Sequence, residues 1–273
     1  MQAGSDVPGR ITKLPGGVAM NIAMTLRRFD LYPSLLSVVG HDPEGIELIK
    51  AAKVLDLDTQ YLYRSQDLPT DQYMAIEGSN GLIAAIADAH SLEAAGDKIL
   101  RPLEDGRLGT AERPFVGLIA LDGNLTVRLL AQIATSPLFS RSDLRIAPAS
   151  PGKAERLLPL LDHTGATLYV NVEEAGLLCQ TEFYDAQTAA QSLIARGANR
   201  ALVTHGPMSA AVADEQGCDT AAPPAVMASR VTGAGDTFMA AHIAAEVRGQ
   251  RGVAALQFAS NAAAAYVSGK SEG

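Results

Sequence analysis

The chain has few of the features that mark secreted or membrane-bound proteins. Its 273 residues include only two cysteines, Cys179 and Cys218, which lie far apart and outside any metal-ligand spacing. We expect reduced thiols and therefore a cytoplasmic protein. No apolar run reaches the roughly 18 residues that a membrane span needs, and no apolar signal-peptide segment follows the polar residues 1–10. We therefore expect no membrane partner.

Basic residues are also scarce. The 22 lysines and arginines are outnumbered by 30 aspartates and glutamates, which gives a net charge of −8. Nucleic-acid-binding domains usually carry a basic face, so this balance argues against a nucleic-acid partner. A neutral sugar or nucleoside is compatible with an acidic surface, whereas ATP would need a local anion site. Hydrophobic residues make up 47% of the chain, which is enough for a sizeable core.

From about residue 31 onward, short β-like runs alternate with helical stretches. The expected strands are 34–39, 115–121, 144–147, 167–170 and 200–204, and the expected helices include 125–134, 152–162 and 186–196. Strands separated by helices predict an α/β fold with a mostly parallel sheet and helices on both faces.

Two regions break this alternation. Residues 4–13 read as irregular or edge-strand sequence, and residues 72–76 and 82–86 form a hairpin pattern around an Asn-Gly turn. A β-hairpin within an α/β sequence is typical of a lid. We therefore expect a single domain, 1–273, with lid segments at about 4–14 and 60–88.

The most informative stretch is residues 232–236, Thr-Gly-Ala-Gly-Asp, which opens a helix whose apolar residues recur every four positions and predict one buried face. Unpaired N–H groups in the first turn of a helix form an anion site. Gly233 and Gly235 lack a Cβ, so a phosphate can approach the backbone. Asp236 adds a carboxylate that suits a base for a hydroxyl proton. An anion site with an adjacent base predicts the transfer of a phosphoryl group to an alcohol.

This motif resembles the C-terminal signature of the ribokinase-like (PfkB) family of sugar and nucleoside kinases. Residues 15–23 and 39–45 are similar to the family's N-terminal signature, and residues 170–175 and 203–206 are similar to two of its nucleotide-site segments. All lie in family order over nearly the whole chain. The resemblance implies a ribokinase-like α/β fold with a small β lid, an ATP-dependent kinase activity and Mg²⁺ as cofactor.

The resemblance also implies roles for individual residues. Asp236 is the implied base, and the backbone of Gly233, Ala234 and Gly235 stabilises the transferring phosphoryl group. The other implied residues are Gly16, Gly17 and Asn21 for the sugar; Asn171 and Glu174 for Mg²⁺ through water; and Thr204, Gly206 and Thr232 for the nucleotide. Simpler interpretations stay open, since glycine pairs are common in turns and acidic pairs stabilise helix N-termini.

Several short segments, residues 5–9, 17–23, 83–88, 121–124 and 149–154, are similar to pseudouridine kinases. That similarity implies phosphorylation of the 5′-hydroxyl of pseudouridine. Asp122, Asn124 and Lys153 are then candidates for the substrate cleft or its support, with loop caps at strand ends as the alternative. A kinase for another sugar or nucleoside, such as ribose or adenosine, and a non-catalytic nucleoside-binding member are the other hypotheses.

Two departures from the family pattern bear on the expected fold and cofactors. The family begins with a β-strand that carries an acidic residue, but only fifteen residues precede Gly16, so we expect this first strand to be missing. Arg230 stands where many relatives carry an aspartate that helps to hold a monovalent cation, which makes K⁺ activation doubtful. Exposed lid strands often pair with a second copy, so we also expect a homodimer.

Overall fold

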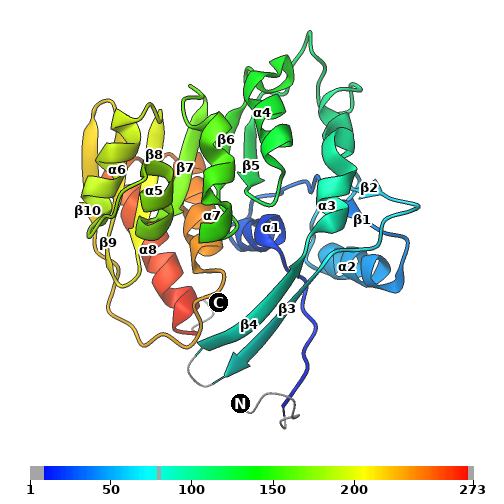
Figure 1. The fold of residues 1–273 in the computed structure, drawn as a ribbon, viewed down its shortest axis with the longest axis horizontal. Coiled ribbons are helices and arrows are strands. Elements are labelled where there is room, and N and C mark those ends of the chain that lie inside the picture. The colour runs from blue at the N-terminus through cyan, green and yellow to red at the C-terminus, as the bar shows by residue number, and fades with distance from the viewer. Residues whose placement is uncertain (1–8, 79–80, 270–273) are drawn as a thin grey trace.

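A computed structural model describes residues 9–78 and 81–269 and contains a central six-stranded sheet with the order β10-β9-β8-β7-β6-β5 (Figure 1). The strands are β5 (Leu118–Asp122), β6 (Asp143–Ala147), β7 (Ala166–Asn171), β8 (Arg200–His205), β9 (Met208–Asp214) and β10 (Gly217–Ala221). Strands β5 to β8 are parallel, whereas β9 and β10 are antiparallel to their neighbours. The predicted mostly parallel sheet is confirmed.

Helical layers cover both faces of this sheet, as predicted (Figure 1). One layer holds α4 (Val127–Thr135), η3 (Pro151–Leu160), α5 (Val172–Cys179) and α6 (Ala186–Ala195), and the other holds α1 (Val18–Arg28), α7 (Ala234–Val247) and α8 (Gly252–Val267). Successive strand residues point to opposite faces. In β8, Ala201 and Val203 therefore join the first core, and Leu202 joins the second.

Two expected helices differ in detail. The segment expected as a helix over 152–162 is the 3₁₀ helix η3, which contains Pro159, and a proline inside a helix removes a backbone donor. Helix α7 was expected to bury one face, yet residues 237–246 are all buried. The reason is that α7 contacts α1, α8 and β7, so neighbours surround its middle, and the exposed residues, Gly235 and Val247, lie at its ends.

The predicted hairpin is present as β3 (Gln72–Gly78) and β4 (Gly81–Asp88), which pair with each other outside the central sheet (Figure 1). The predicted turn residues Ser79 and Asn80 lie outside the described residues. Within the expected strand 34–39, only β1 (Val38–Val39) forms, and it pairs with β2 (Tyr63–Arg64). Residues 9–14 contain neither helix nor strand, so this described part of the other expected lid segment is irregular.

Both ends of the hairpin are fixed by carboxylates. Asp42, the N-cap of α2 (Pro43–Val54), accepts hydrogen bonds from the backbone N–H and the hydroxyl of Thr70, both at 2.6 Å. Asp71 accepts from the backbone N–H groups of Ser91 and Leu92 at the start of α3 (His90–Ala95), both at 2.9 Å. The Thr70 hydrogen bond also lowers the pKa of Asp42. The base of the hairpin is therefore anchored to the domain.

The remaining elements are the 3₁₀ segments η1 (Gly96–Leu103) and η2 (Pro137–Phe139). Over the described part of the chain, no helix is both long and apolar enough to cross a membrane. Strand β5 forms one edge of the central sheet, and none of the described residues pairs with its outer side.

Candidate active site

The predicted site residues gather at the carboxyl edge of the sheet. Asp122 ends β5, Asn171 ends β7, and Thr204 lies beside Asn171 in the β7–β8 register. Parallel α/β sheets bind ligands at this edge because the helices that follow the strands begin there. Gly206, with a positive φ of 52°, turns the chain from β8 into β9 at the same edge.

One hydrogen bond joins the two glycine motifs, although 215 residues separate its partners. The side-chain amide of Asn21 in α1 donates to a carboxylate oxygen of Asp236 in α7 at 2.8 Å. Gly17 precedes α1 with a φ of 97°, and both Gly16 and Gly17 are exposed. The sequence suggested that Asn21 holds a sugar, and the structure adds that it orients Asp236.

Asp236 is a half-buried carboxylate with altered acidity. Burial raises its pKa from 3.8 to about 6, the hydrogen bond from Asn21 opposes this shift, and the negative charge of Asp122 adds to it. A base with a pKa near the working pH is well placed to accept a proton. The raised pKa is compatible with the predicted role of Asp236 as a base.

The three candidate substrate residues form a connected chain. The backbone N–H of Asn124 donates to Asp122 at 2.7 Å, and the Lys153 ammonium group donates to the side-chain oxygen of Asn124 at 2.6 Å. Burial raises the pKa of Asp122, against the opposing effects of Asn124 and Lys153. The loop-cap interpretation therefore holds for the Asn124 backbone, while Lys153 supplies a positive charge next to the carboxylates.

The start of α7 depends on glycine at position 233. Gly233 has a φ of 88°, and a Cβ there would lie 2.6 Å from the hydroxyl oxygen of Tyr266. The Tyr266 hydroxyl donates to the carbonyl oxygen of Thr232 at 2.9 Å and so holds the loop against α8. Glycine is thus required by both the backbone and the neighbouring ring.

The expected anion-binding amides need one correction. The backbone N–H of Ala234 already donates to the carbonyl oxygen of Val231 at 3.1 Å, because the chain makes a tight turn before α7. Within the described residues, the N–H groups at the start of α7 that have no backbone acceptor, and so are left for an anion, are those of Gly233, Gly235 and Asp236. Ala234 contributes the turn that exposes them.

Asn171 and Glu174 form a reciprocal capping box at the start of α5. The backbone N–H of Glu174 donates to the Asn171 side chain, and the backbone N–H of Asn171 donates to the Glu174 carboxylate, both at 2.8 Å. Burial raises the pKa of Glu174 to about 7, and the negative charges of Glu173 and Asp236 add to this shift. The helix-stabilising interpretation is correct for this pair and leaves one oxygen of Glu174 for another partner.

The chemistry of these groups fits Mg²⁺ held through water. Magnesium prefers oxygen ligands, keeps several waters, and would offset the charge of Asp122, Glu174 and Asp236, whose pKa values are all raised. Across residues 9–78 and 81–269, no cluster of three His, Cys, Asp or Glu side chains could hold a metal ion by itself. Water and phosphate oxygens would therefore complete the coordination.

Arg230 does not enter the carboxylate cluster. Its guanidinium group lies 3.8 Å from the centre of the Tyr266 ring, and its Nε donates to the Tyr266 carbonyl oxygen at 2.9 Å. Tyr266 thus holds both Arg230 and the loop before α7, a supporting role that the sequence did not reveal. In the sequence, Tyr266 stands out only as a tyrosine after an alanine-rich run, which does not indicate its partners.

The pfkB family of carbohydrate kinases matches residues 3–273. The chain belongs to this family of phosphotransferases, whose acceptors are alcohol groups. Its fold is ribokinase-like: ribokinase from Thermotoga maritima superposes with a TM-score of 0.75 at 19% identity, covering 93% of this chain and 82% of that one.

Two curated relatives match parts of the chain. A pseudouridine kinase of Arabidopsis thaliana is 30% identical over 83 residues, which are 30% of this chain and 21% of that protein. An uncharacterized sugar kinase of Escherichia coli K12 is 28% identical over 200 residues, which are 72% of this chain and 53% of that protein. The matches thus span about a fifth and about half of these relatives' lengths.

Proposed function

We propose that this protein uses ATP to phosphorylate the 5′-hydroxyl of a nucleoside, with pseudouridine as the acceptor. The observation that carries the proposal is the 2.8 Å hydrogen bond between Asn21 and Asp236 at the glycine-rich start of α7. It places an oriented carboxylate directly beside amides that have no helical partner. A base next to an anion site is what transfer of a phosphoryl group to an alcohol requires.

In this mechanism Asp236 accepts the proton of the acceptor hydroxyl. The N–H groups of Gly233, Gly235 and Asp236 stabilise charge on the transferring group, and positioning matters more than base strength because the transition state is loose. Asn171 and Glu174 would hold Mg²⁺ through water, and the ion would offset phosphate charge. Gly16 and Gly17 leave room for the ribose, while Thr204, Gly206 and Thr232 border the nucleotide.

The hairpin β3–β4 would cover the acceptor and exclude water, which otherwise competes for the phosphoryl group. The Lys153–Asn124–Asp122 chain would support the sugar hydroxyls from the end of β5. The Arg230 guanidinium lies on Tyr266, so it is not placed to supply positive charge beside the carboxylates in place of K⁺. K⁺ activation stays doubtful, because Arg230 stands where many relatives carry an aspartate.

The substrate assignment rests on the similar segments and on the partial match to a pseudouridine kinase. ADP release should be measured with Mg-ATP and pseudouridine, with uridine, ribose and adenosine as controls, with and without K⁺. Turnover on pseudouridine alone would support the assignment. Turnover only on another acceptor would keep the kinase mechanism and reject pseudouridine. No turnover on any acceptor would favour a nucleoside-binding protein.

The hairpin supports the proposed homodimer. Met74 and Ile86 are cross-strand partners with 62% and 66% of their surfaces exposed, and Tyr73 of the adjacent position is 57% exposed. Exposed apolar strands usually pair with another chain. Met74→Glu with Ile86→Glu should convert a dimer to a monomer in light scattering. The matched control Val54→Glu, on the exposed surface of α2, should leave the mass unchanged, and a wild-type monomer would refute the proposal.

A further inference from the structure

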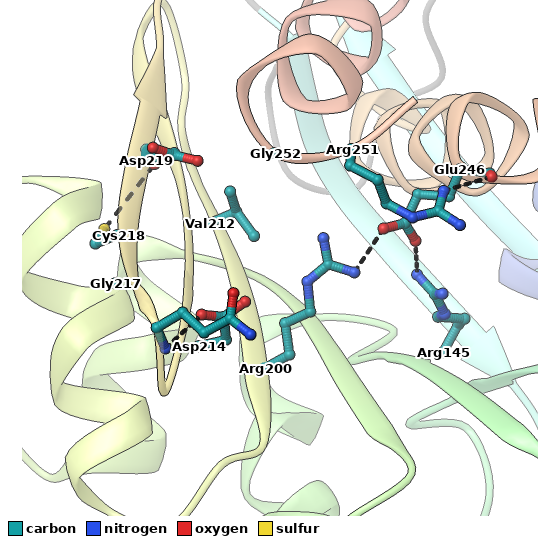
Figure 2. Close-up of a pocket in the computed structure, with 11 residues that line it drawn as sticks. Arg145, Arg200, Val212, Asp214, Gly217, Cys218, Asp219, Glu246, Arg251 and Gly252 are labelled. Atoms are coloured by element: carbon teal, nitrogen blue, oxygen red, sulfur yellow. Dashed lines mark hydrogen bonds and ion pairs between the residues drawn. The ribbon is translucent and has the colours of Figure 1, made fainter. Parts of the chain in front are cut away.

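A polar cavity of about 590 Å³ lies away from the candidate active site, and Figure 2 shows its lining. Arg200 begins β8, whereas Thr204 lies at the active-site end of the same strand. Four residues of strand correspond to about 13 Å, so the cavity opens near the amino edge of the sheet. None of the residues assigned to phosphoryl transfer lines it.

One wall of the cavity is an ion network around Glu246. This carboxylate accepts hydrogen bonds from Arg145 and from Arg200, the latter at 2.6 Å (Figure 2). Arg145 also makes two hydrogen bonds of 2.7 Å to Asp143. Arg145 and Glu246 are 7% and 8% exposed, so the wall is a fixed and buried structure. Buried charges need partners of opposite charge, because moving a charged group out of water costs free energy.

Positive charge on this wall exceeds what the network neutralises. Arg251 donates through one nitrogen to the backbone carbonyl oxygens of Glu246 and Gln250, at 2.6 and 2.7 Å, rather than to a carboxylate. Arg200 Nε is buried and has no hydrogen-bond partner among the described residues. Three guanidinium groups therefore share two carboxylates, those of Asp143 and Glu246.

The opposite wall is acidic and comes from the β9–β10 hairpin. Asp214 and Asp219 lie across the cavity from Arg251 (Figure 2). Carboxylates accept hydrogen bonds from hydroxyl groups, whereas a guanidinium fork matches the oxygens of a phosphate. A cavity of about 590 Å³ falls within the range of small-molecule sites and exceeds the needs of a lone inorganic ion.

We propose that this cavity is a second binding site, for a small phosphate monoester that carries hydroxyl groups. The phosphate lies against Arg200 and Arg251, and the hydroxyl groups donate to Asp214 and Asp219. Phosphorylated sugars have this chemistry. Because no active-site residue takes part, the proposal does not depend on the proposed kinase reaction.

Calorimetric titration with ribose 5-phosphate, and separately with inorganic phosphate, tests the site at constant ionic strength. Arg251→Gln should weaken the binding of ribose 5-phosphate at least about tenfold, since it removes a charged donor while the hydrogen bonds to the Glu246 carboxylate stay intact. Arg128→Gln, an exposed arginine of α4 outside the cavity, is the matched control and should bind like wild type. The melting temperature of each variant confirms that it is folded.

The acidic wall has its own test. Asp219→Asn should weaken the binding of ribose 5-phosphate several-fold relative to that of inorganic phosphate, because only the sugar reaches this wall while the lost negative charge acts on both phosphates alike. Equal affinities of the wild type for the two ligands would overturn the hydroxyl assignment. Binding that Arg251→Gln does not change would place the ligand elsewhere, and no binding at millimolar concentrations would show that the arginines serve only the fold.

Discussion

Replacing Asp236 by asparagine should stabilise the protein while it removes most of the turnover. Burial raises the pKa of this carboxyl from 3.8 to about 6, so the folded state holds the proton more tightly than the unfolded state does. Below the unfolded value both states are protonated, and the carboxyl costs no stability. Above about pH 6 the folded protein carries a poorly solvated charge, and its destabilising effect is complete.

The magnitude follows from the size of the shift. A shift of about two pKa units corresponds to about 3 kcal/mol, and we expect about 1–2 kcal/mol because the side chain is only partly shielded from water. Asparagine keeps an oxygen that can accept the Asn21 hydrogen bond, so the packing should persist. For a chain of this size, the melting temperature should rise by about 2–6 °C at pH 8, with little difference near pH 4.

Thermal unfolding followed by circular dichroism at both pH values measures this difference. Asp97→Asn, which replaces an exposed aspartate of η1, is the matched control. It should leave the melting temperature unchanged at both pH values. A variant no more stable than wild type at pH 8 would refute the electrostatic reasoning. In the ADP-release assay, Asp236→Asn should lose about 10²–10⁴-fold in turnover, and near-wild-type activity would reject Asp236 as the base.

Four further substitutions, two of them combined in one protein, test the support of this site. Asn21→Ala removes the hydrogen bond that lowers the pKa of Asp236, so the acidic limb of the pH profile of kcat/KM should move to higher pH. Glu174→Gln can keep the capping box, so thermal unfolding should show no loss of stability, while the Mg²⁺ concentration for half-maximal activity rises several-fold. Gly233→Ala should destabilise by about 1–3 kcal/mol and raise the KM for ATP, and Tyr266→Phe in the same protein should restore part of the stability.

The sequence predicted the central strands well because they are apolar and buried on both faces. Residues 167–170, for example, lie within β7, and the helix expected over 186–196 is α6, whose N-cap Asp185 marks its start. The local spacing of apolar residues gave a wrong prediction where contacts with other elements determine how much of a helix is buried. The fourfold spacing after Asp236 predicts one buried face, but it cannot reveal that α1, α8 and the sheet all contact α7.

The contacts within the site could be predicted only in part. The family resemblance assigned Asn21 and Asp236 to one site, yet the hydrogen bond between them depends on how α1 packs against α7. The role of Tyr266 was not predictable, since its partners come from the loop before α7. Arg145 gave a usable signal, because an arginine within the buried strand β6 requires a partner from elsewhere, here Glu246.

The electrostatics of the carboxyl edge explain why a divalent cation suits this site. The chain carries a net charge of −8, and Asp122, Glu174 and Asp236 all have raised pKa values at the place where phosphates would bind. Lys153 offsets one charge, and helix amides supply only partial ones. Since the arginines of the ion network lie near the other edge of the sheet, an anionic nucleotide would meet repulsion unless it arrived with its own cation. The proposed metal dependence would therefore follow from this charge distribution, although the described residues form no cage of metal-binding side chains.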